Sequence, residues 1–354
     1  MKKLKACILG STGNVGQHFV KLLSNHPFFE IEGLAASEKS AGTIYENVVD
    51  WTVSTHIPEN VRDITVCSTD SKSLEKLGVD LFFSALPGDI SREKESEIAR
   101  MGYPVFTNAS GNRMTPHVPI LIPEINSDHI ELINHQKYNG GYIVANSNCS
   151  TSGLVFGLKP LQSFGIREVF VTTYQAVSGA GRKGVASMDI LGNIIPFIKN
   201  EEAKLESETQ IILGHLKDRE VERAKFPINA SCARVPVMDG HLESVAVKLE
   251  DDISCDVVID EFAGFSGPPQ ELSLPTAPAA PIIIQQEDNR PQPQRDLSDN
   301  GMSVSIGRVR KKGDWLNFFL LVHNTIRGAA GASILNAEYS YVKGLLGQKT
   351  EVAT

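Results

Sequence analysis

The sequence predicts an α/β protein with two domains: a doubly wound parallel sheet first, then an α+β domain with a mostly antiparallel sheet. Three observations support this fold class. The 354 residues correspond to roughly two domains at about 150 residues each. A short apolar run opens into a glycine-rich turn and then a helical periodicity, which is typical of a βαβ unit. Longer strand patterns with fewer helices fill the second half, as in α+β domains.

Composition excludes several classes of protein. Hydrophobic residues make up 41% and charged residues 21%, which is ordinary globular usage. The net charge is −8 without a basic cluster, so we expect no nucleic-acid partner. No run of about 18 apolar residues occurs, so we expect no membrane span. The 5 cysteines are dispersed and odd in number, which indicates neither a disulfide framework nor a zinc site and favours a reducing, cytoplasmic compartment.

The first half alternates strand and helix patterns. Residues 91–101 read as a helix, and the apolar runs between such stretches suit a parallel sheet covered on both faces. The expected strands are residues 5–9, 31–36, 64–67, 81–86, 105–107 and 141–145. We place the domain boundary after this last strand, so that the first domain spans residues 1–148.

The second domain spans residues 149–324 in this interpretation. Its expected strands are residues 168–176, 230–237, 241–249, 302–309 and 315–323. Prolines crowd residues 268–295, and because proline lacks the amide proton this segment predicts an extended arm or loop. The Ala-rich periodic stretch 325–346 predicts a terminal helix, and we assign residues 325–354 to the first domain, against which this helix packs.

The turn Gly10-Ser-Thr-Gly13-Asn-Val-Gly16 follows a strand and opens a helix, which is the context of a Rossmann-type dinucleotide site. Glycines let the backbone approach a pyrophosphate while the amide groups of the helix N-terminus point at it. A tight turn without a ligand is the alternative. The second strand ends without an acid, in residues that can hold a 2′-phosphate, Ser37, Lys39 and Ser40. These favour NADP over NAD, although Glu38 argues the other way.

Cys149 stands where a strand gives way to a helix, so it is expected at the positive end of the helix dipole, where a thiolate is favoured. This position suits a nucleophile. The other cysteines, three of them within strand patterns, read as small buried hydrophobic residues. His241 heads a strand after Asp239-Gly240, seven residues beyond Arg234. By spacing alone it is no more than a polar residue at a turn.

Together, eight motifs resemble the aspartate-β-semialdehyde dehydrogenase family, in the branch typical of archaea and fungi. The likeness runs along the whole chain and is carried by residues 10–16, 84–87, 110–113, 148–149, 175–181, 200–204, 234–241 and 324–331, with the proline-rich segment 289–295. The resemblance implies an NADP-dependent enzyme of lysine, threonine, methionine and isoleucine biosynthesis. It would reduce L-aspartyl 4-phosphate to L-aspartate 4-semialdehyde with release of phosphate. It also implies assembly through the second domain into a homodimer or homotetramer.

The resemblance also implies roles for individual residues. Cys149 would form the thioester, His241 would be the acid/base group beside the sulfur, and Gln175 would orient the acyl group. Arg234 would hold the substrate's α-carboxylate, and the other substrate contacts would be Asn112, Arg113, Glu201 and Lys204. The cofactor contacts would be Gly10, Ser11, Thr12, Gly13, Asn14, Val15, Ser37, Lys39, Ser40, Ser84, Leu86, Ser178, Gly179 and Asn324. No metal site is expected.

Two other functions stay open. The first is an acylating malonyl-CoA reductase that uses the same cysteine and NADPH. The second is an enzymatically silent NADP-binding regulator, which would need neither Cys149 nor His241. An N-acetylglutamyl phosphate reductase is more distant, because the stretch 234–241 resembles that family less.

Overall fold

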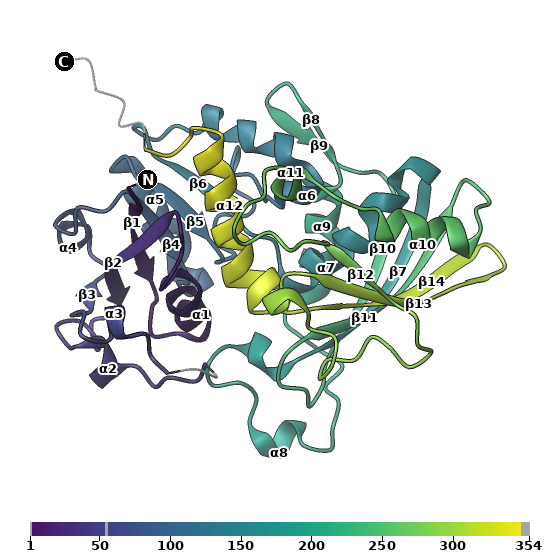
Figure 1. Ribbon diagram of the computed structural model, residues 1–354, viewed down its shortest axis with the longest axis horizontal. Helices are drawn as coiled ribbons and strands as arrows, with labels where there is room; N and C mark the ends of the chain where they lie inside the picture. The colour runs from purple at the N-terminus through teal and green to yellow at the C-terminus, as the bar shows by residue number, and fades with distance from the viewer. Residues whose placement is uncertain (1, 54–55, 348–354) are drawn as a thin grey trace.

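A computed structural model describes residues 2–53 and 56–347 of the chain. Two sheets lie apart in it, with α12 (Gly331–Val342) running between them (Figure 1). The first sheet is parallel throughout and has the strand order β3-β2-β1-β4-β5-β6. Its strands are β1 (Leu4–Leu9), β2 (Phe29–Ala36), β3 (Cys67–Ser68), β4 (Leu81–Ser84), β5 (Pro104–Thr107) and β6 (Tyr142–Ala145). This order reverses direction between β1 and β4, where Rossmann-type sheets bind dinucleotides.

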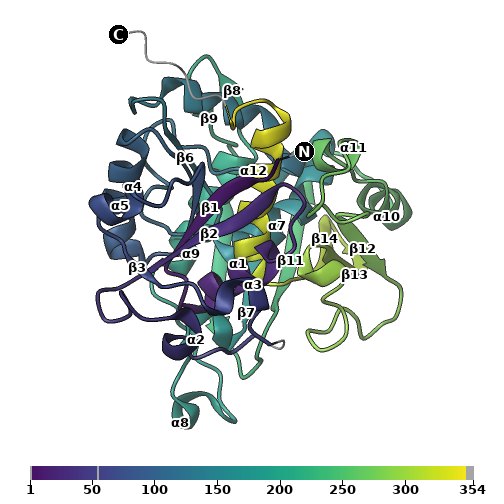
Figure 2. The same ribbon diagram turned by 60° about the vertical axis from the view of Figure 1, so that its left-hand side comes forward.

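Helices cover this sheet because its strands are apolar on both faces. The core strand residues are fully buried, among them Ile8, Phe83 and Phe106. The elements around the sheet are α1 (Asn14–Leu23), α2 (Tyr45–Val48), α3 (Glu59–Arg62), α4 (Ser71–Glu75), α5 (Gly88–Arg100), α6 (Pro123–Asn126) and the 3₁₀ helix η1 (Ser127–His135). The C-terminal α12 also packs here, against α1 and β5 (Figure 2). Residues 348–354, which we assigned to the same domain, lie outside the described residues.

The second sheet is mixed, with the order β10-β7-β11-β14-β13-β12. Three of its neighbouring pairs are antiparallel and the two outer pairs are parallel. Its strands are β7 (Ile166–Gln175), β10 (Ile228–Arg234), β11 (His241–Leu249), β12 (Ile282–Gln285), β13 (Val304–Lys312) and β14 (Trp315–Val322). The α+β prediction with a mostly antiparallel sheet is therefore confirmed.

The helices of the second half lie on one face of this sheet. They are α7 (Cys149–Leu158), α9 (Glu201–Ile212) and α10 (Cys255–Ala263), whereas α11 (Pro268–Glu271) contacts α6 instead. Residues 150–158 of α7 are all buried, as expected of a helix that is enclosed on every side. Gly153 and Gly157 let α7 approach β14 closely, because a Cβ atom there would lie 2.7 Å from Val322 and 2.8 Å from Phe318. This close packing fixes the first residue of α7, Cys149.

The remaining elements are short and connect the larger ones. The 3₁₀ helix η2 (Lys159–Phe164) continues α7, and η3 (Val177–Ala180) follows β7. The hairpin of β8 (His215–Lys217) and β9 (Glu220–Glu222) follows α9, and α8 (Ser187–Ile190) protrudes from the body of the molecule (Figure 1). No helix in the described part of the chain is long and apolar enough to cross a bilayer.

Three expectations about elements need correction. The strand expected at 64–67 is confined to Cys67–Ser68, because the backbone of residues 64–66 bonds to Thr43 and Tyr45 instead. The proline-rich segment 268–295 is not only an arm: it begins with α11, whose prolines sit in the first turn where they are tolerated, and it contributes β12 at the sheet edge. The terminal helix begins as a π-helical turn (Ile326–Ala330) before α12.

Candidate active site

The glycine turn is built for close approach of a ligand. Gly10 has φ +76°, and a Cβ there would lie 2.7 Å from the carbonyl oxygen of Ala85. A Cβ on Gly16 would meet the Gly10 carbonyl oxygen, so α1 can start this near β1 only with glycine. Gly13 caps α1 without a side chain on its first amide groups, and the first turn holds no acid. The turn thus offers an open, positive helix end to a phosphate group.

Strand β2 ends at the same edge of the sheet as the glycine turn, because β1 and β2 are parallel. Ser37 and Lys39 are exposed there, whereas Ser40 is nearly buried. Glu38, the acid that argues against NADP, accepts a hydrogen bond of 2.6 Å from the Ser68 hydroxyl. Hydroxyls and an ammonium group are therefore available at the position where a 2′-phosphate is held in such folds.

Cys149 is the first residue of α7, and Asn148 caps that helix. The Asn148 carboxamide oxygen accepts from the amides of Ser150 and Thr151 at 3.0 and 3.1 Å. The Cys149 sulfur lies 3.2 Å from Nε2 of His241, which starts β11 in the next layer. Gly328 closes the other side, since a Cβ there would lie 2.7 Å from Cβ of Cys149. The structure thus brings together the two residues that sequence places 92 positions apart.

The peptide of Ala176 fixes both His241 and Arg234. Its N–H donates to Nδ1 of His241 at 3.1 Å, and its carbonyl oxygen accepts from Nη1 of Arg234 at 2.8 Å. Because Nδ1 is an acceptor, the neutral imidazole carries its proton on Nε2, which faces the sulfur. Gly179 lies against both side chains: a Cβ there would be 2.9 Å from Arg234 Nη1 and 3.2 Å from the His241 ring.

The cysteine and the histidine are both uncharged at neutral pH. Burial, reinforced by Glu201, raises the pKa of the Cys149 thiol to about 12, and Arg113 and Arg234 oppose this only in part. Burial, reinforced by Arg234, lowers the pKa of His241 to about 3. Desolvation of the thiol thus outweighs the effect of the helix N-terminus, which the sequence predicts to favour a thiolate.

Glu201 connects three other polar side chains of the site, those of Asn148, Gln175 and Lys204. Its Oε1 accepts from the carboxamides of Asn148 at 2.9 Å and Gln175 at 3.1 Å. Lys204, one helical turn on, has its Nζ 3.8 Å from Glu201 Oε2 and keeps an exposed fraction of 35%. The carboxylate therefore orients Gln175 at the end of β7 and leaves the ammonium group free to meet solvent or a ligand.

Glu208 is a site residue that the sequence analysis missed. Its Oε1 accepts from Nη1 of Arg113 at 3.1 Å, and its Oε2 accepts from the backbone N–H of Asn148 at 2.5 Å. This buried carboxylate therefore ties Arg113 to the residue that caps the cysteine helix. Its spacing of seven residues from Glu201, two helical turns on the same face of α9, is the signal that identifies it.

Most of the predicted residues line a single cavity of about 580 Å³ between the two sheets. They are Gly13, Asn14, Val15, Leu86, Arg113, Cys149, Gln175, Ser178, Gly179, Glu201, Lys204, Arg234 and Asn324. His241 does not line this cavity and lies fully buried behind the sulfur. The residues Gly10, Ser11, Thr12, Ser37, Lys39 and Ser40 belong to the turn after β1 and the end of β2, outside that lining.

Two residues that the sequence predicts to contact substrate or cofactor have side chains that bond to another residue of the protein instead. Asn112 and Ser84 are fully buried and both donate to the carboxylate of Glu95, at 2.8 and 2.7 Å. Thr107 donates to the same carboxylate at 2.6 Å. The side chains of Asn112 and Ser84 therefore hold the loops behind the cavity together, and neither lines the cavity as the sequence predicted.

Comparison with known proteins agrees with this arrangement. Residues 5–133 match the family model "Semialdehyde dehydrogenase, NAD binding domain", and residues 158–327 match "Semialdehyde dehydrogenase, dimerisation domain". An aspartate-semialdehyde dehydrogenase of Methanothermobacter thermautotrophicus is 48% identical over 94% of this chain and 97% of its own. A malonyl CoA reductase (NADP) of Metallosphaera sedula is 35% identical over 98% of this chain and 99% of its own.

A solved structure carries the same fold. The Candida albicans aspartate semialdehyde dehydrogenase crystallised with NADP has a TM-score of 0.88 and 36% identity, over 97% of this chain and 99% of that one. Archaeal and fungal relatives thus both align along nearly the whole length. The chain belongs to the aspartate-semialdehyde dehydrogenase family.

Proposed function

We propose that this enzyme converts L-aspartyl 4-phosphate and NADPH to L-aspartate 4-semialdehyde and phosphate, on the route to lysine, threonine, methionine and isoleucine. One observation carries the proposal. A partly buried cysteine at a helix N-terminus lies 3.2 Å from an imidazole and lines a cavity that holds two nearly buried arginines. This is a nucleophile beside a site for two anionic groups.

The two arginines match the two ends of the substrate. Arg234 still has N–H groups to offer beyond the one bonded to Ala176, and a planar fork suits the α-carboxylate. Arg113 is held from behind by Glu208 and by the Asn108 carbonyl oxygen at 3.0 Å, which orients it for the phosphoryl group. Lys204 and Glu201 supply a cation for phosphate and a carboxylate for the amino group.

Cys149 attacks the acyl carbon of the acyl phosphate as the bond to phosphate breaks. The sulfur begins as a thiol, since burial raises its pKa to about 12. A thiol and an acyl phosphate dianion give a thioester and hydrogen phosphate, so the proton balance closes if the departing phosphate takes the thiol proton. Both N–H groups of Gln175 are engaged, by Glu201 at 3.1 Å and by the Thr173 hydroxyl at 3.2 Å, so its carboxamide oxygen is the group left to orient the bound acyl group.

His241 acts as a hydrogen-bond donor to the sulfur in this proposal. To take the thiol proton it would need a free lone pair on Nε2, and to become an imidazolium it would need a proton on Nδ1. The Ala176 N–H occupies Nδ1, so both states lose a buried hydrogen bond. The acid/base role suggested by the resemblance is thus replaced by stabilisation of negative charge on sulfur, which develops whenever the carbon–sulfur bond forms or breaks.

The glycine turn and the end of β2 would hold NADP(H). The Cβ contacts at Gly10 and Gly16 show a cradle that only glycine leaves open, and Ser37 and Lys39 suit the 2′-phosphate. When bound, NADPH supplies the hydride that converts the thioester to the aldehyde. We expect Lys39→Glu to raise the KM for NADPH at least tenfold and to leave the KM for NADH within about threefold. A matched change at the exposed Lys72 is the control.

Phosphate-dependent formation of NADPH from aspartate semialdehyde tests the reaction directly. Turnover that requires both inorganic phosphate and Cys149 supports the proposal, and turnover that persists in Cys149→Ala refutes it. Malonyl-CoA reduction is the parallel assay, because the 35% identical relative bears that activity in its name. A higher kcat/KM with malonyl-CoA than with aspartyl phosphate would assign the chain to that second function.

The open face of the second sheet is the proposed homodimer surface. Helices α7, α9 and α10 contact its strands on one side. On the other side, the alternate residues of β7, β11 and β14 stay half-exposed and include aromatic side chains, Phe170, Tyr174, Trp315 and Phe319. Light scattering on Phe170→Glu should show a loss of dimer or tetramer, whereas an unchanged mass would exclude this face.

The state of the cysteines supports a reducing compartment. All five are free, including Cys149. A thioester mechanism needs the free thiol of Cys149, and disulfides are rare in the cytoplasm. We therefore propose a cytoplasmic enzyme, and fractionation of the source cells tests this.

A further inference from the structure

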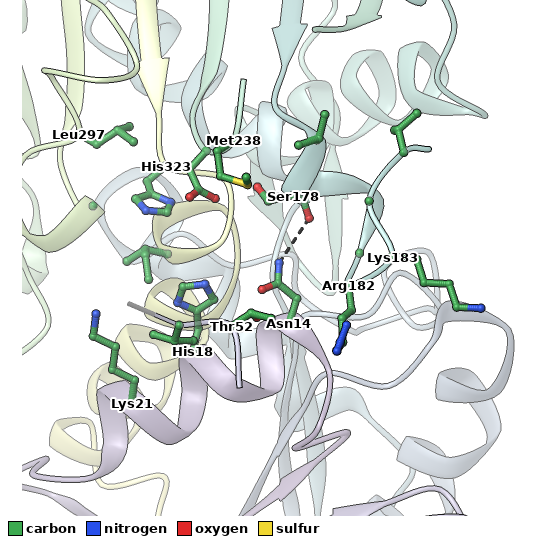
Figure 3. A pocket seen from close by; sticks show the side chains of 18 of the residues that line it. Asn14, His18, Lys21, Thr52, Ser178, Arg182, Lys183, Met238, Leu297 and His323 are labelled. Carbon is green, nitrogen blue, oxygen red and sulfur yellow. Dashed lines mark hydrogen bonds between the residues drawn. The ribbon is translucent and has the colours of Figure 1, made fainter. Parts of the chain in front are cut away.

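A second cavity, of about 820 Å³, lies between the two domains on the outer side of α1. Figure 3 shows Asn14, His18 and Lys21 of α1 on one wall, with His323, Met238 and Leu297 opposite. The sulfur of Cys149 does not line it. Its volume is within the range of small-molecule sites, and its position at a domain interface is where such sites are common.

The cavity combines an apolar wall with a cluster of basic groups. Val177, Ile190, Leu191, Leu297 and Ile326 give it an apolar wall. The rings of His18 and His323 meet edge to face with their centroids 6.4 Å apart. Lys21 follows His18 by three residues on α1, so both side chains project to the same side, as Figure 3 shows.

The basic cluster has one acidic neighbour among the lining residues, Asp239, whose charge acts on both His18 and His323. Nδ1 of His18 is buried without a hydrogen-bond partner, and within the described ranges Lys21 forms no ion pair. Arg182 on the far wall is paired with Asp50, and the exposed Lys183 is the next lining residue. The lining therefore carries an excess of positive charge.

We propose that this cavity binds a small organic anion, with the acidic group between His18, Lys21 and His323 and an apolar body against Ile190 and Leu191. The site adjoins the cavity that holds Cys149 and shares Asn14, Ser178, Gly181 and Arg182 with it, but His18, Lys21 and His323 line this cavity alone, and binding there does not depend on the proposed reaction. A polar head and an apolar wall together favour an aromatic or aliphatic carboxylate, sulfonate or phosphate over an inorganic ion.

An anion should also bind more tightly as the pH falls. Burial lowers the pKa of His18 to about 4, helped by His323 and Lys21 and opposed by Asp239. Burial likewise lowers the pKa of His323, opposed by Asp239 and helped to a smaller extent by Lys21. A bound anion favours the protonated imidazoles, so protons are taken up on binding and the affinity rises from pH 8 to pH 6.

An anion bound in this cavity should affect the residues around Cys149. Asn14 donates to the Ser178 carbonyl oxygen at 3.4 Å, and Asn324 donates to the Ser178 hydroxyl at 2.8 Å. Asn324 also accepts from the amide of Gly240, the residue before His241, at 2.9 Å. Because the cavity walls come from both domains, a ligand there holds the two at one separation. We expect partial inhibition that saturating NADP and aspartate semialdehyde do not relieve.

Calorimetry with benzenesulfonate on the NADP-saturated enzyme tests the site, because the charge of this probe is constant between pH 6 and 8. We expect His18→Gln/Lys21→Gln to weaken binding at least tenfold, while the exposed pair His56→Gln/Lys76→Gln has no effect. Arg113→Gln should also leave the affinity within twofold. The reverse pattern, in which Arg113→Gln abolishes binding and the His18/Lys21 variant does not, would place the anion in the catalytic cavity and overturn the proposal. An absence of binding at millimolar probe would overturn it as well.

The calorimetric titration tests the anion site even if the proposed reaction is wrong, because it measures the heat of binding and not turnover. Thermal unfolding of each variant shows whether it is folded, and His323→Gln serves as a second variant on the opposite wall if the double variant is not. An affinity for benzenesulfonate that does not change between pH 6 and pH 8 would contradict the part played by the two imidazoles.

Discussion

Replacement of His241 separates a hydrogen-bond donor from a proton shuttle. His241→Leu removes the Nε2–H that lies 3.2 Å from the Cys149 sulfur, and His241→Gln keeps an N–H donor there. A hydrogen bond to a charged group contributes about 1.5–3 kcal/mol. Since each 1.4 kcal/mol is about tenfold, the leucine variant should lose about 10- to 150-fold in kcat/KM. The glutamine variant should recover part of that loss.

The pH profile provides the second readout. With a pKa of about 3, roughly one His241 in 10⁴ is an imidazolium at pH 7, so its titration falls below the assay range. The profiles of the wild type and of both variants should therefore have the same shape between pH 5.5 and 9. A shuttle predicts the opposite: a wild-type limb near pH 6–7 that disappears in both variants, with losses of about 10²- to 10⁴-fold that glutamine does not rescue.

The assay is phosphate-dependent NADPH formation, followed at saturating NADP over the pH range. NADP titration of each variant controls for the cofactor site. Rescue by glutamine with an unchanged profile supports the donor role. An imidazole limb in the wild type, lost in His241→Gln, would refute the argument from the Ala176 amide.

Three further outcomes follow from the site. Gly328→Ala should abolish turnover, because its Cβ would lie 2.7 Å from Cβ of Cys149, while calorimetry should find NADP binding intact. Arg234→Lys keeps the charge but loses the planar fork, so kcat/KM for aspartate semialdehyde should fall about 10- to 100-fold; wild-type kinetics would exclude the carboxylate role. Glu208→Gln weakens the hold on Arg113 and should raise the KM for phosphate more than it lowers kcat; an equal effect on both would point to a purely structural residue.

Most strands follow from periodicity, since apolar runs predict β1, β2, β4, β5 and β6 of the first sheet and give β11 to the residue. The misses have local causes. Residues 64–66 read as a strand by composition, yet their backbone groups bond to another loop, and no residue pattern specifies that partner. The short edge strand β12 lies among prolines, whose number signals loop and hides four consecutive strand residues, Ile282–Gln285.

The site was less predictable, because residue type does not say which way a polar side chain points. Asn112 and Ser84 belong to motifs beside the cavity, yet both satisfy the buried Glu95. Burial raises the pKa of that carboxyl group, opposed by the hydrogen bonds it accepts. A buried carboxylate without these donors would destabilise the folded state. Ser84 and Asn112 therefore stabilise the fold and do not face a ligand. Glu208 was missed for the converse reason: it reads as a helix-surface acid although it is almost fully buried.

The proposed role of His241 depends on a backbone group, the N–H of Ala176, whose position cannot be inferred from residue types. The Ala176 peptide is an ordinary N–H and C=O between β7 and η3, and its side chain carries no chemistry. Through it the end of β7 sets the tautomer of His241 and the direction of Arg234, with distances of 3.1 and 2.8 Å. Gly179 lets the next loop approach both side chains, because a Cβ there would lie 2.9 Å from Arg234 Nη1 and 3.2 Å from the His241 ring. A histidine beside a cysteine suggests a proton shuttle by analogy, whereas the backbone around it favours a fixed donor, and the two are distinguished only by what Nδ1 contacts.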